Sequence, residues 1–194
     1  MRTIETPQKV RSIAFSPDGT RLAWTSQGAT TLADLTGNPE RVFRHSSRLI
    51  ARLLDAGPMA AISPDGRLIA FTKERLSLRD FDATAGKIWI ADLVTGADLV
   101  ELGHDGRVQA MVFSPDSARL AVSGTKATTQ IWDVTDGTEL LRIAHLAGPP
   151  GLAFSPDGTR LATASSSFWG RDRTWEAEIW DSESVRLVSL SVAG

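Results

Sequence analysis

The 194-residue chain contains no cysteine and no tyrosine, and only three of its residues are histidine. The absence of cysteine excludes disulfide bonds, thiolate nucleophiles and zinc sites with cysteine ligands. No apolar run reaches the roughly 18 residues that a membrane-spanning helix needs, and residues 1–7 lack the apolar segment of a secretion signal. Lysine and arginine (21) nearly balance aspartate and glutamate (23), whereas nucleic-acid binding needs a basic excess. We therefore expect a cytoplasmic protein that binds neither nucleic acid nor membrane.

The sequence does contain an internal repeat built on the tripeptide Ser-Pro-Asp. This tripeptide occurs four times, at Ser16–Asp18, Ser63–Asp65, Ser114–Asp116 and Ser155–Asp157. Proline followed by aspartate and, in three of the repeats, by glycine is typical of a tight turn. Short runs of apolar and β-branched residues flank each turn, which predicts two buried strands joined by a hairpin.

A second marker follows each predicted strand pair, where a third apolar run ends in aspartate. In the last two repeats this marker is Trp132-Asp133 and Trp180-Asp181. Three repeats then place a histidine eight residues after a glycine, as His45, His104 and His145. The resulting unit has four strands, and four such units predict an all-β fold.

With these markers, the sequence resembles the WD-repeat (WD40-type) β-propeller family. The third repeat carries the resemblance most fully, with Gly103-His104, Phe113-Ser114-Pro115-Asp116 and Ile131-Trp132-Asp133. The second repeat has Ala91-Asp92 instead, and is similar to the propellers of Tol-associated and prolyl-oligopeptidase proteins. The resemblance implies four-stranded antiparallel blades at about 10–45, 58–104, 105–145 and 146–194, with an N-terminal extension at 1–9 and an insertion at 46–57.

The resemblance also implies a hydrogen-bonded chain of histidine, serine or threonine, aspartate and tryptophan across each blade. His104, Ser123 and Trp132 match this chain, but the following loop, residues 126–129, contains no aspartate. Because the histidines occupy equivalent positions in different blades, they do not converge, and we expect neither a metal site nor a cofactor. We expect the repeat positions to be structural: His45, His104, His145, Ser123, Trp132, Asp133, Trp180 and Asp181.

Four blades leave one apolar sheet face uncovered at each end of the series. Propeller rings commonly close with more blades than four. Burying two such faces would stabilise the protein by as much as a whole domain's folding free energy, roughly 5–15 kcal/mol. Three arrangements satisfy this need: a longer propeller that contains these blades, a ring of two chains, or a strained four-bladed ring. We rank them in that order and expect association with further blades or with a second copy.

The extra residues of the longer repeats suggest where a partner binds. They lie between the second and third strands of a blade or between blades: 46–57, 73–86 and 165–175. These connections share one end of an antiparallel blade, so we expect all the long loops on one face of the propeller. The last loop contains Trp169, Arg171, Arg173 and Trp175. Tryptophan and arginine are enriched in interface hot spots, so these four residues are the candidate partner-binding site.

The sequence offers little for catalysis. It lacks the G-x-S-x-G, H-E-x-x-H and P-loop motifs, and most of its repeat aspartates are explained by turns. We therefore expect no enzyme, but a non-catalytic protein–protein interaction scaffold of the WD-repeat type that binds a protein or peptide through the face with the long loops. The alternative is a propeller module of a larger peptidase, kinase or Tol-like periplasmic protein that gates or recruits substrate.

Overall fold

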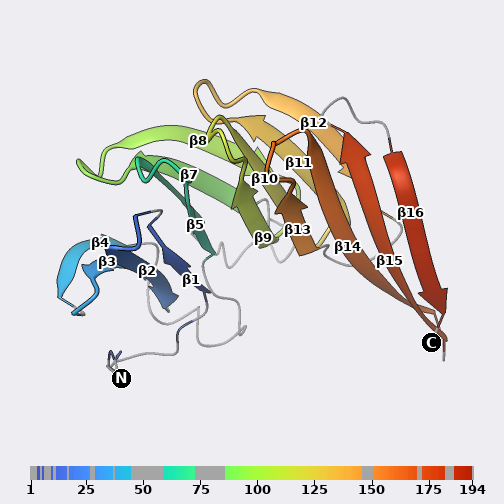
Figure 1. Ribbon diagram of the computed structural model, residues 1–194, viewed down its shortest axis with the longest axis horizontal. Helices are drawn as coiled ribbons and strands as arrows, with labels where there is room; N and C mark the ends of the chain where they lie inside the picture. The colour runs from blue at the N-terminus through green and yellow to red at the C-terminus, as the bar shows by residue number, and fades with distance from the viewer. Residues whose placement is uncertain are drawn as a thin grey trace, which may run out of the picture. The chain divides into compact units, whose positions relative to one another are not determined.

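The computed structural model describes residues 4, 6, 10, 12–16, 18–26, 29–36, 38–44, 59–72, 86–145, 151–169, 172–181 and 186–193. Sixteen β-strands form in these residues, and they assemble into four antiparallel four-stranded sheets (Figure 1). This confirms the expected all-β architecture. The chain divides into two compact units, Met1–Gly103 and His104–Gly194. The described residues include no helix that is long and apolar enough to cross a membrane.

The first unit holds the first two sheets. The first sheet contains β1 (Ser12–Phe15), β2 (Arg21–Ser26), β3 (Ala29–Asp34) and β4 (Pro39–Arg44). The second sheet contains β5 (Ala60–Ile62), β6 (Leu68–Thr72), β7 (Gly86–Asp92) and β8 (Asp98–His104), whose last residue begins the second unit. His45, the predicted insertion at 46–57 and most of residues 1–9 lie outside the described residues.

The second unit holds the other two sheets. The third sheet contains β9 (Val108–Phe113), β10 (Arg119–Gly124), β11 (Thr128–Asp133) and β12 (Glu139–Ala144). The fourth sheet contains β13 (Gly151–Phe154), β14 (Arg160–Trp169), β15 (Asp172–Asp181) and β16 (Arg186–Ala193). In every sheet the strands lie side by side in sequence order, as expected for strands joined by hairpins.

Each Ser-Pro-Asp turn joins the first strand of a sheet to the second. The backbone N–H of Gly19 donates to the Ser16 carbonyl at 2.8 Å, and the glycine adopts a φ of +67°, which other residues rarely adopt. Gly66 and Gly158 behave in the same way. In the third repeat, which lacks this glycine, Ser117 itself adopts a φ of +62°. The turn geometry therefore persists where its preferred residue is absent.

The second strand of every sheet presents the same pair of residue types to opposite sides. Six positions after the turn serine comes a branched aliphatic residue, Leu22, Ile69, Leu120 or Leu161, and the next residue is Ala23, Ala70, Ala121 or Ala162. Successive residues of a strand point to opposite faces, so each sheet has a leucine face and an alanine face, named after these residues.

The core of each unit forms where an alanine face meets a leucine face. In the first unit, Ala23 and Leu32 of the first sheet pack against Ile69 and Phe71 of the second. In the second unit, the alanine face of the third sheet packs against the leucine face of the fourth, through a cluster of four buried residues: Ala121, Ile131, Ile143 and Leu161. Apolar burial between sheets is the main favourable contribution to such a fold.

Residues 165–175 are not the long loop that the sequence analysis predicts. Strands β14 and β15 pair without interruption from Arg160↔Asp181 to Trp169↔Asp172, which leaves only residues 170 and 171 between them (Figure 1). The extra residues therefore lengthen a hairpin. Threonine, phenylalanine and tryptophan favour extended strands, and a ladder that has already formed can be prolonged without closing a new loop.

Candidate functional site

The candidate partner-binding residues stand at the end of this long hairpin. Trp169 is the last residue of β14, Arg173 and Trp175 lie in β15, and Arg171 lies outside the described residues. In the register of the sheet, Phe168 is opposite Arg173 and Trp169 is opposite Asp172. The hairpin thus brings the candidate positions together at one end of the fourth sheet.

The hairpin end extends beyond the first strand of its sheet. Among the described strands, β13 pairs with β14 only as far as Gly151↔Ala164. Strand β16 accompanies β15 further, to Thr174↔Ala193. The last residues of β14 and β15 therefore form a projection with fewer neighbouring strands than the rest of the sheet.

The opposite end of the sheets is occupied by the Ser-Pro-Asp turns, and their polar groups are satisfied within each turn. In the fourth turn the Ser155 hydroxyl donates to Asp157 at 2.5 Å and accepts from the Arg160 N–H at 2.9 Å. Asp157 also accepts from the backbone N–H of Thr159 at 3.0 Å. These hydrogen bonds, above all the one from Ser155, lower the pKa of Asp157 to about 2. Such a carboxylate stays ionised and serves the turn, so it is poorly suited to be a general base.

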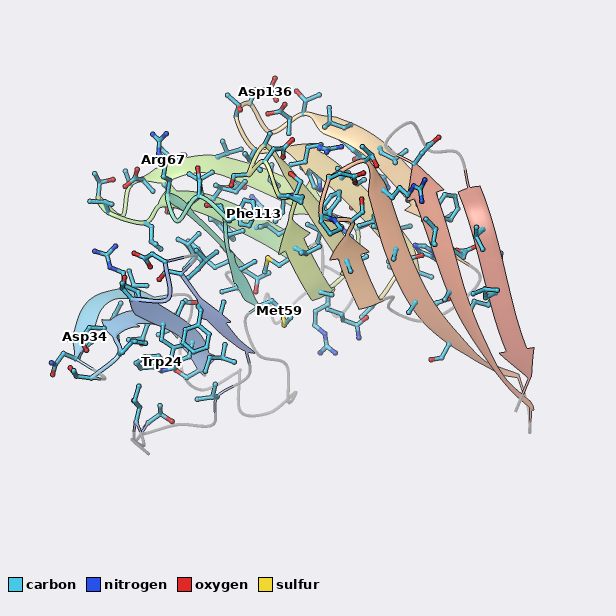
Figure 2. The ribbon with its side chains drawn as sticks, viewed as in Figure 1. Trp24, Asp34, Met59, Arg67, Phe113 and Asp136 are labelled. Carbon is cyan, nitrogen blue, oxygen red and sulfur yellow. The ribbon has the colours of Figure 1, made fainter. Side chains whose placement is uncertain are left out.

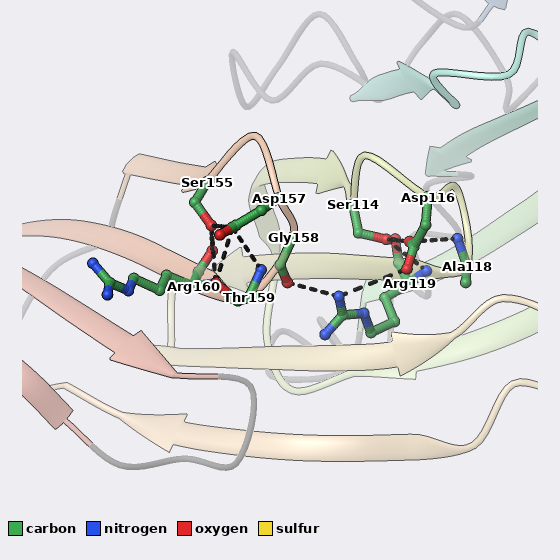
Figure 3. A network of polar contacts seen from close by, with 9 residues as sticks. All are labelled: Ser114, Asp116, Ala118, Arg119, Ser155, Asp157, Gly158, Thr159 and Arg160. Carbon is green, nitrogen blue, oxygen red and sulfur yellow. Dashed lines mark hydrogen bonds and ion pairs between the residues drawn. The ribbon is translucent and has the colours of Figure 1, made fainter.

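The third and fourth turns are joined by one arginine (Figure 3). Arg119 donates from Nη2 to the Gly158 carbonyl at 2.7 Å, and its guanidinium carbon lies 5.5 Å from the centre of the Phe154 ring. The same group is 3.8 Å from Asp116. Arg119 therefore ties the third sheet to the fourth at the turn end, which is a structural role.

The aspartate that ends each third strand also closes a turn. The Asp34 carboxylate accepts from the backbone N–H groups of Thr36 at 2.8 Å and Asn38 at 3.0 Å and from the Thr36 hydroxyl, and the latter bond is the main cause of a pKa of about 2. Asp133 receives the N–H of Thr135 at 2.7 Å. Asp34 and Asp133 thus stabilise the backbone of the turns that follow their strands.

A buried polar cluster lies between the third and fourth sheets. His145 approaches the Thr129 hydroxyl through Nε2 at 2.8 Å and Glu178 through Nδ1 at 3.3 Å. The side chains of His145 and Glu178 are 1% and 8% exposed, and burial lowers the pKa of the histidine. Next to this pair, Trp180 Nε1 donates to the Thr163 hydroxyl at 3.1 Å, and its ring meets that of His145 edge-on. The cluster therefore adds directional polar contacts to an apolar interface.

Sequence reasoning missed Thr129 and Glu178 as members of this cluster. Glu178 lies 33 positions from His145 in sequence, so no local pattern connects them. One signal was present in the sequence. Glu178 lies two positions before Trp180 and therefore on the same, inward side of an apolar strand, where an acidic residue needs a partner.

Two stretches of the sequence, residues 96–133 and 138–175, match the family described as WD domain, G-beta repeat. They include β8, all four strands of the third sheet and the first two strands of the fourth. The chain carries WD40 repeats and has the fold of a β-propeller. No curated protein matches its sequence.

The WD40 propeller is also similar to a solved structure, that of Kuenenia stuttgartiensis hydrazine synthase. The TM-score is 0.69 with 17% sequence identity, and the match covers 93% of this chain and 48% of the other. This chain thus spans about half the length of that neighbour. Altogether 1134 solved chains match, so the similarity establishes the fold and leaves the function open.

In the third WD40 repeat, His104, Ser123 and Trp132 do not complete the implied hydrogen-bonded chain. Within the described part of the chain, neither ring nitrogen of His104 nor Nε1 of Trp132 has a hydrogen-bond partner. Burial lowers the pKa of His104. Gly124 packs so closely on this ring that an added Cβ would lie 2.4 Å from Nε2. The His104 side chain is held there chiefly by packing.

WD40 repeats generally act as protein-interaction scaffolds and are typically non-catalytic. Within the described residues, no group of three or more acidic or histidine side chains could hold a metal ion. The described repeat aspartates are engaged in turns, and the described histidines lie in separate buried positions. The arrangement therefore offers surfaces for binding, whereas its clustered polar groups stabilise the fold.

Proposed function

We propose that this WD40 propeller is a non-catalytic scaffold that binds a protein or peptide partner through the end of the β14–β15 hairpin. The observation that carries the proposal is the projection of this hairpin beyond β13, which separates its end from the rest of the sheet. The partner-binding residues are Trp169, Arg171, Arg173 and Trp175.

The chemistry of the hairpin end favours a peptide that carries acidic and apolar side chains. Arginine binds carboxylates through paired hydrogen bonds, and tryptophan provides a large apolar surface with few rotatable bonds. A ladder of paired backbone holds these positions at a set spacing, as Trp169↔Asp172 and Phe168↔Arg173 illustrate. Such a rigid platform reduces the entropy that is lost on binding.

The test is a selection of binding peptides from a display library with the full chain as bait. Selected peptides are then titrated against a variant in which Trp169, Arg171, Arg173 and Trp175 are all alanine. We expect at least a tenfold rise in Kd, because truncating hot-spot residues commonly costs more than about 1.4 kcal/mol.

The matched control is Arg160→Ala, at the opposite end of β14, where the residue is exposed. We expect this variant to bind within about twofold of the unchanged chain, as is usual for an exposed residue outside the contact. Circular dichroism of both variants checks that the sheets are retained. Unchanged affinity in the fourfold variant would contradict the proposed site.

A further inference from the structure

The alanine face of the fourth sheet is apolar across all four strands and is exposed. The register aligns two rows of residues across it: Ala153↔Ala162↔Ile179↔Val188 and Gly151↔Ala164↔Ala177↔Leu190. None of these eight residues is charged or polar. Leu190 is 63% exposed and Val188 is 43% exposed, and all the others except the half-buried Ile179 are exposed as well. A continuous apolar patch of this kind marks a binding surface.

The same protein shows what covers an alanine face. The alanine face of the first sheet is buried by the leucine face of the second, where Ala23 is 2% exposed. The alanine face of the third sheet is buried by the leucine face of the fourth, where Ala121 is 0% exposed. In both contacts an alanine face meets the leucine face of the following sheet, and the residue types are the same. The occupant that fits the alanine face of the fourth sheet is therefore the leucine face of another such sheet.

The chain itself carries a leucine face with exposed apolar residues, on the first sheet. Ile13 and Phe15 are 62% and 64% exposed, and Val42 in β4 is 43% exposed. Between them Leu22 and Trp24, each 8% exposed, and the fully buried Ala33 form a cluster against which Ile4 packs, so the exposed part of this face lies at Ile13, Phe15 and Val42 (Figure 2 labels Trp24). The rows Ile13↔Trp24↔Thr31↔Val42 and Phe15↔Leu22↔Ala33 contain no charged residue, so this face matches the other in polarity.

We propose that the alanine face of the fourth sheet binds the leucine face of the first sheet of a second copy of this chain. The contact is head-to-tail, because one copy contributes β13–β16 and the other contributes β1–β4. It uses the rows through Ala162 and Ala164, whereas the proposed partner site begins in the next row of the sheet, at Trp175, so the two surfaces adjoin but use different residues.

The size of these faces supports a second copy as the occupant. Four strands about 4.8 Å apart, with about 3.3 Å per residue, present a face on the order of 400–600 Å². Because Leu22, Trp24 and Ala33 are already buried, two copies that form the contact twice would bury at most roughly 1,600–2,400 Å² in total, which overlaps the range of stable protein–protein interfaces. A head-to-tail contact closes into a ring or continues as a longer array, and either form raises the mass of the particle.

The experiment measures the mass of the full chain by light scattering at micromolar concentration, together with two single variants. Leu190→Asp places a charge on the alanine face, and Phe15→Asp places one on the leucine face. We expect the unchanged chain to self-associate and each variant alone to be a monomer. Mixing the two variants should restore a one-to-one complex, because each variant retains the face that the other has lost.

Several outcomes would overturn the proposal. A monomeric unchanged chain would mean that the face is covered by something other than a second copy. Self-association of Phe15→Asp alone would show that the alanine faces contact each other, and failure of the mixed variants to combine would exclude the head-to-tail contact. Leu99→Asp and Leu140→Asp, two exposed leucines on β8 and β12, are the controls and should self-associate normally.

The variants also separate this proposal from the proposed function. Leu190→Asp and Phe15→Asp should bind the selected peptides with unchanged affinity, because they leave the hairpin end intact. The fourfold hairpin variant should in turn keep the mass of the unchanged chain. Circular dichroism checks that each variant is folded, which is expected because Leu190 and Phe15 are exposed within a single chain.

Discussion

In the third sheet Ala121 is completely buried, whereas Ala162, at the equivalent position of the fourth sheet, is exposed. The residues beside them in sequence, Leu120 and Leu161, are both buried, with exposures of at most 2%. The third sheet is therefore buried on both faces and the fourth on one. The repeat encodes the same sheet in both places, and only the neighbours differ.

This difference indicates how much of a blade's stability comes from its neighbours. The fourth sheet is anchored through its leucine face, by the apolar cluster around Leu161 and by the polar cluster of His145 and Glu178. Its alanine face contributes nothing to the core of a single chain. In a repeat architecture of this kind, stability is approximately the sum of the stabilities of the repeats and of the interfaces between them.

The largest expected effect is the loss of stability when Leu161, in the interface between the third and fourth sheets, is replaced by alanine. The side chain is 2% exposed and packs where the third and fourth sheets meet. Removing it from a closely packed core should lower the free energy of unfolding by about 2–5 kcal/mol, because a cavity replaces the lost contacts. Chemical denaturation followed by circular dichroism measures this change.

Leu140→Ala is the control for that substitution. Leu140 lies in β12 and is exposed, so the same chemical change should alter stability by less than about 0.5 kcal/mol. If Leu161→Ala were as mild as this control, the fourth sheet would not depend on its leucine face, and the comparison between the two sheets would fail.

A smaller effect is expected when each of the two repeat alanines, Ala121 and Ala162, is replaced by leucine. Ala121→Leu adds bulk to a filled interface and should cost about 1–3 kcal/mol, whereas Ala162→Leu adds it to an exposed face and should change stability by less than about 0.5 kcal/mol. Both variants are measured in chains that also carry Phe15→Asp, so that self-association does not contribute. Equal costs at the two positions would indicate that Ala162 is covered within a single chain.

The turns and strands were predictable from the sequence because their causes are local. Ser155, Asp157 and Gly158 lie within four residues and form the turn by bonding to one another and to Arg160. The long hairpin was not predictable, since the length of the spacing between markers does not show whether β14 and β15 continue to pair. The contact of His145 with Glu178 depends on the packing of two sheets, which no single stretch of sequence specifies.

The candidate partner residues show a related limit. Composition singled out Trp169 and Arg173 as residue types that are common in interfaces. Only the register shows that Arg173 and Trp175 occupy positions on one face of the hairpin, whereas Trp169 occupies a position on the other face. The WD40 markers predicted blades, which depend on repeating local patterns. A binding surface depends on how strands of different repeats end, and this part of the chain has no repeat to compare.

The smallest expected effect is a dependence of stability on pH that distinguishes His104 from His145. Burial lowers the pKa of both His104 and His145. The unfolded state, with an ordinary histidine pKa of about 6.5, therefore binds more protons as the pH falls below that value. The stability that the neutral histidines provide is complete above about pH 6.5 and is lost as the pH falls, by at most about 1.4 kcal/mol per pH unit for each histidine.

The carboxylate of Glu178 contacts His145 directly and favours its protonated form. Gln130, Asp105 and Glu139 also raise the pKa of His104, but Arg142 lowers it and no hydrogen bond reaches its ring within the described residues. We therefore expect His104→Gln to flatten the decline of stability between pH 7 and 5 more than His145→Gln does, in denaturation experiments at several pH values. The turn carboxylates do not interfere in this range. The pKa values of Asp18 and Asp157 are lowered to about 2, so the stability that they provide is lost only as the pH falls from about 4 toward 2. An equal or opposite order of the two histidine variants would show that the carboxylate of Glu178 does not offset the burial of His145.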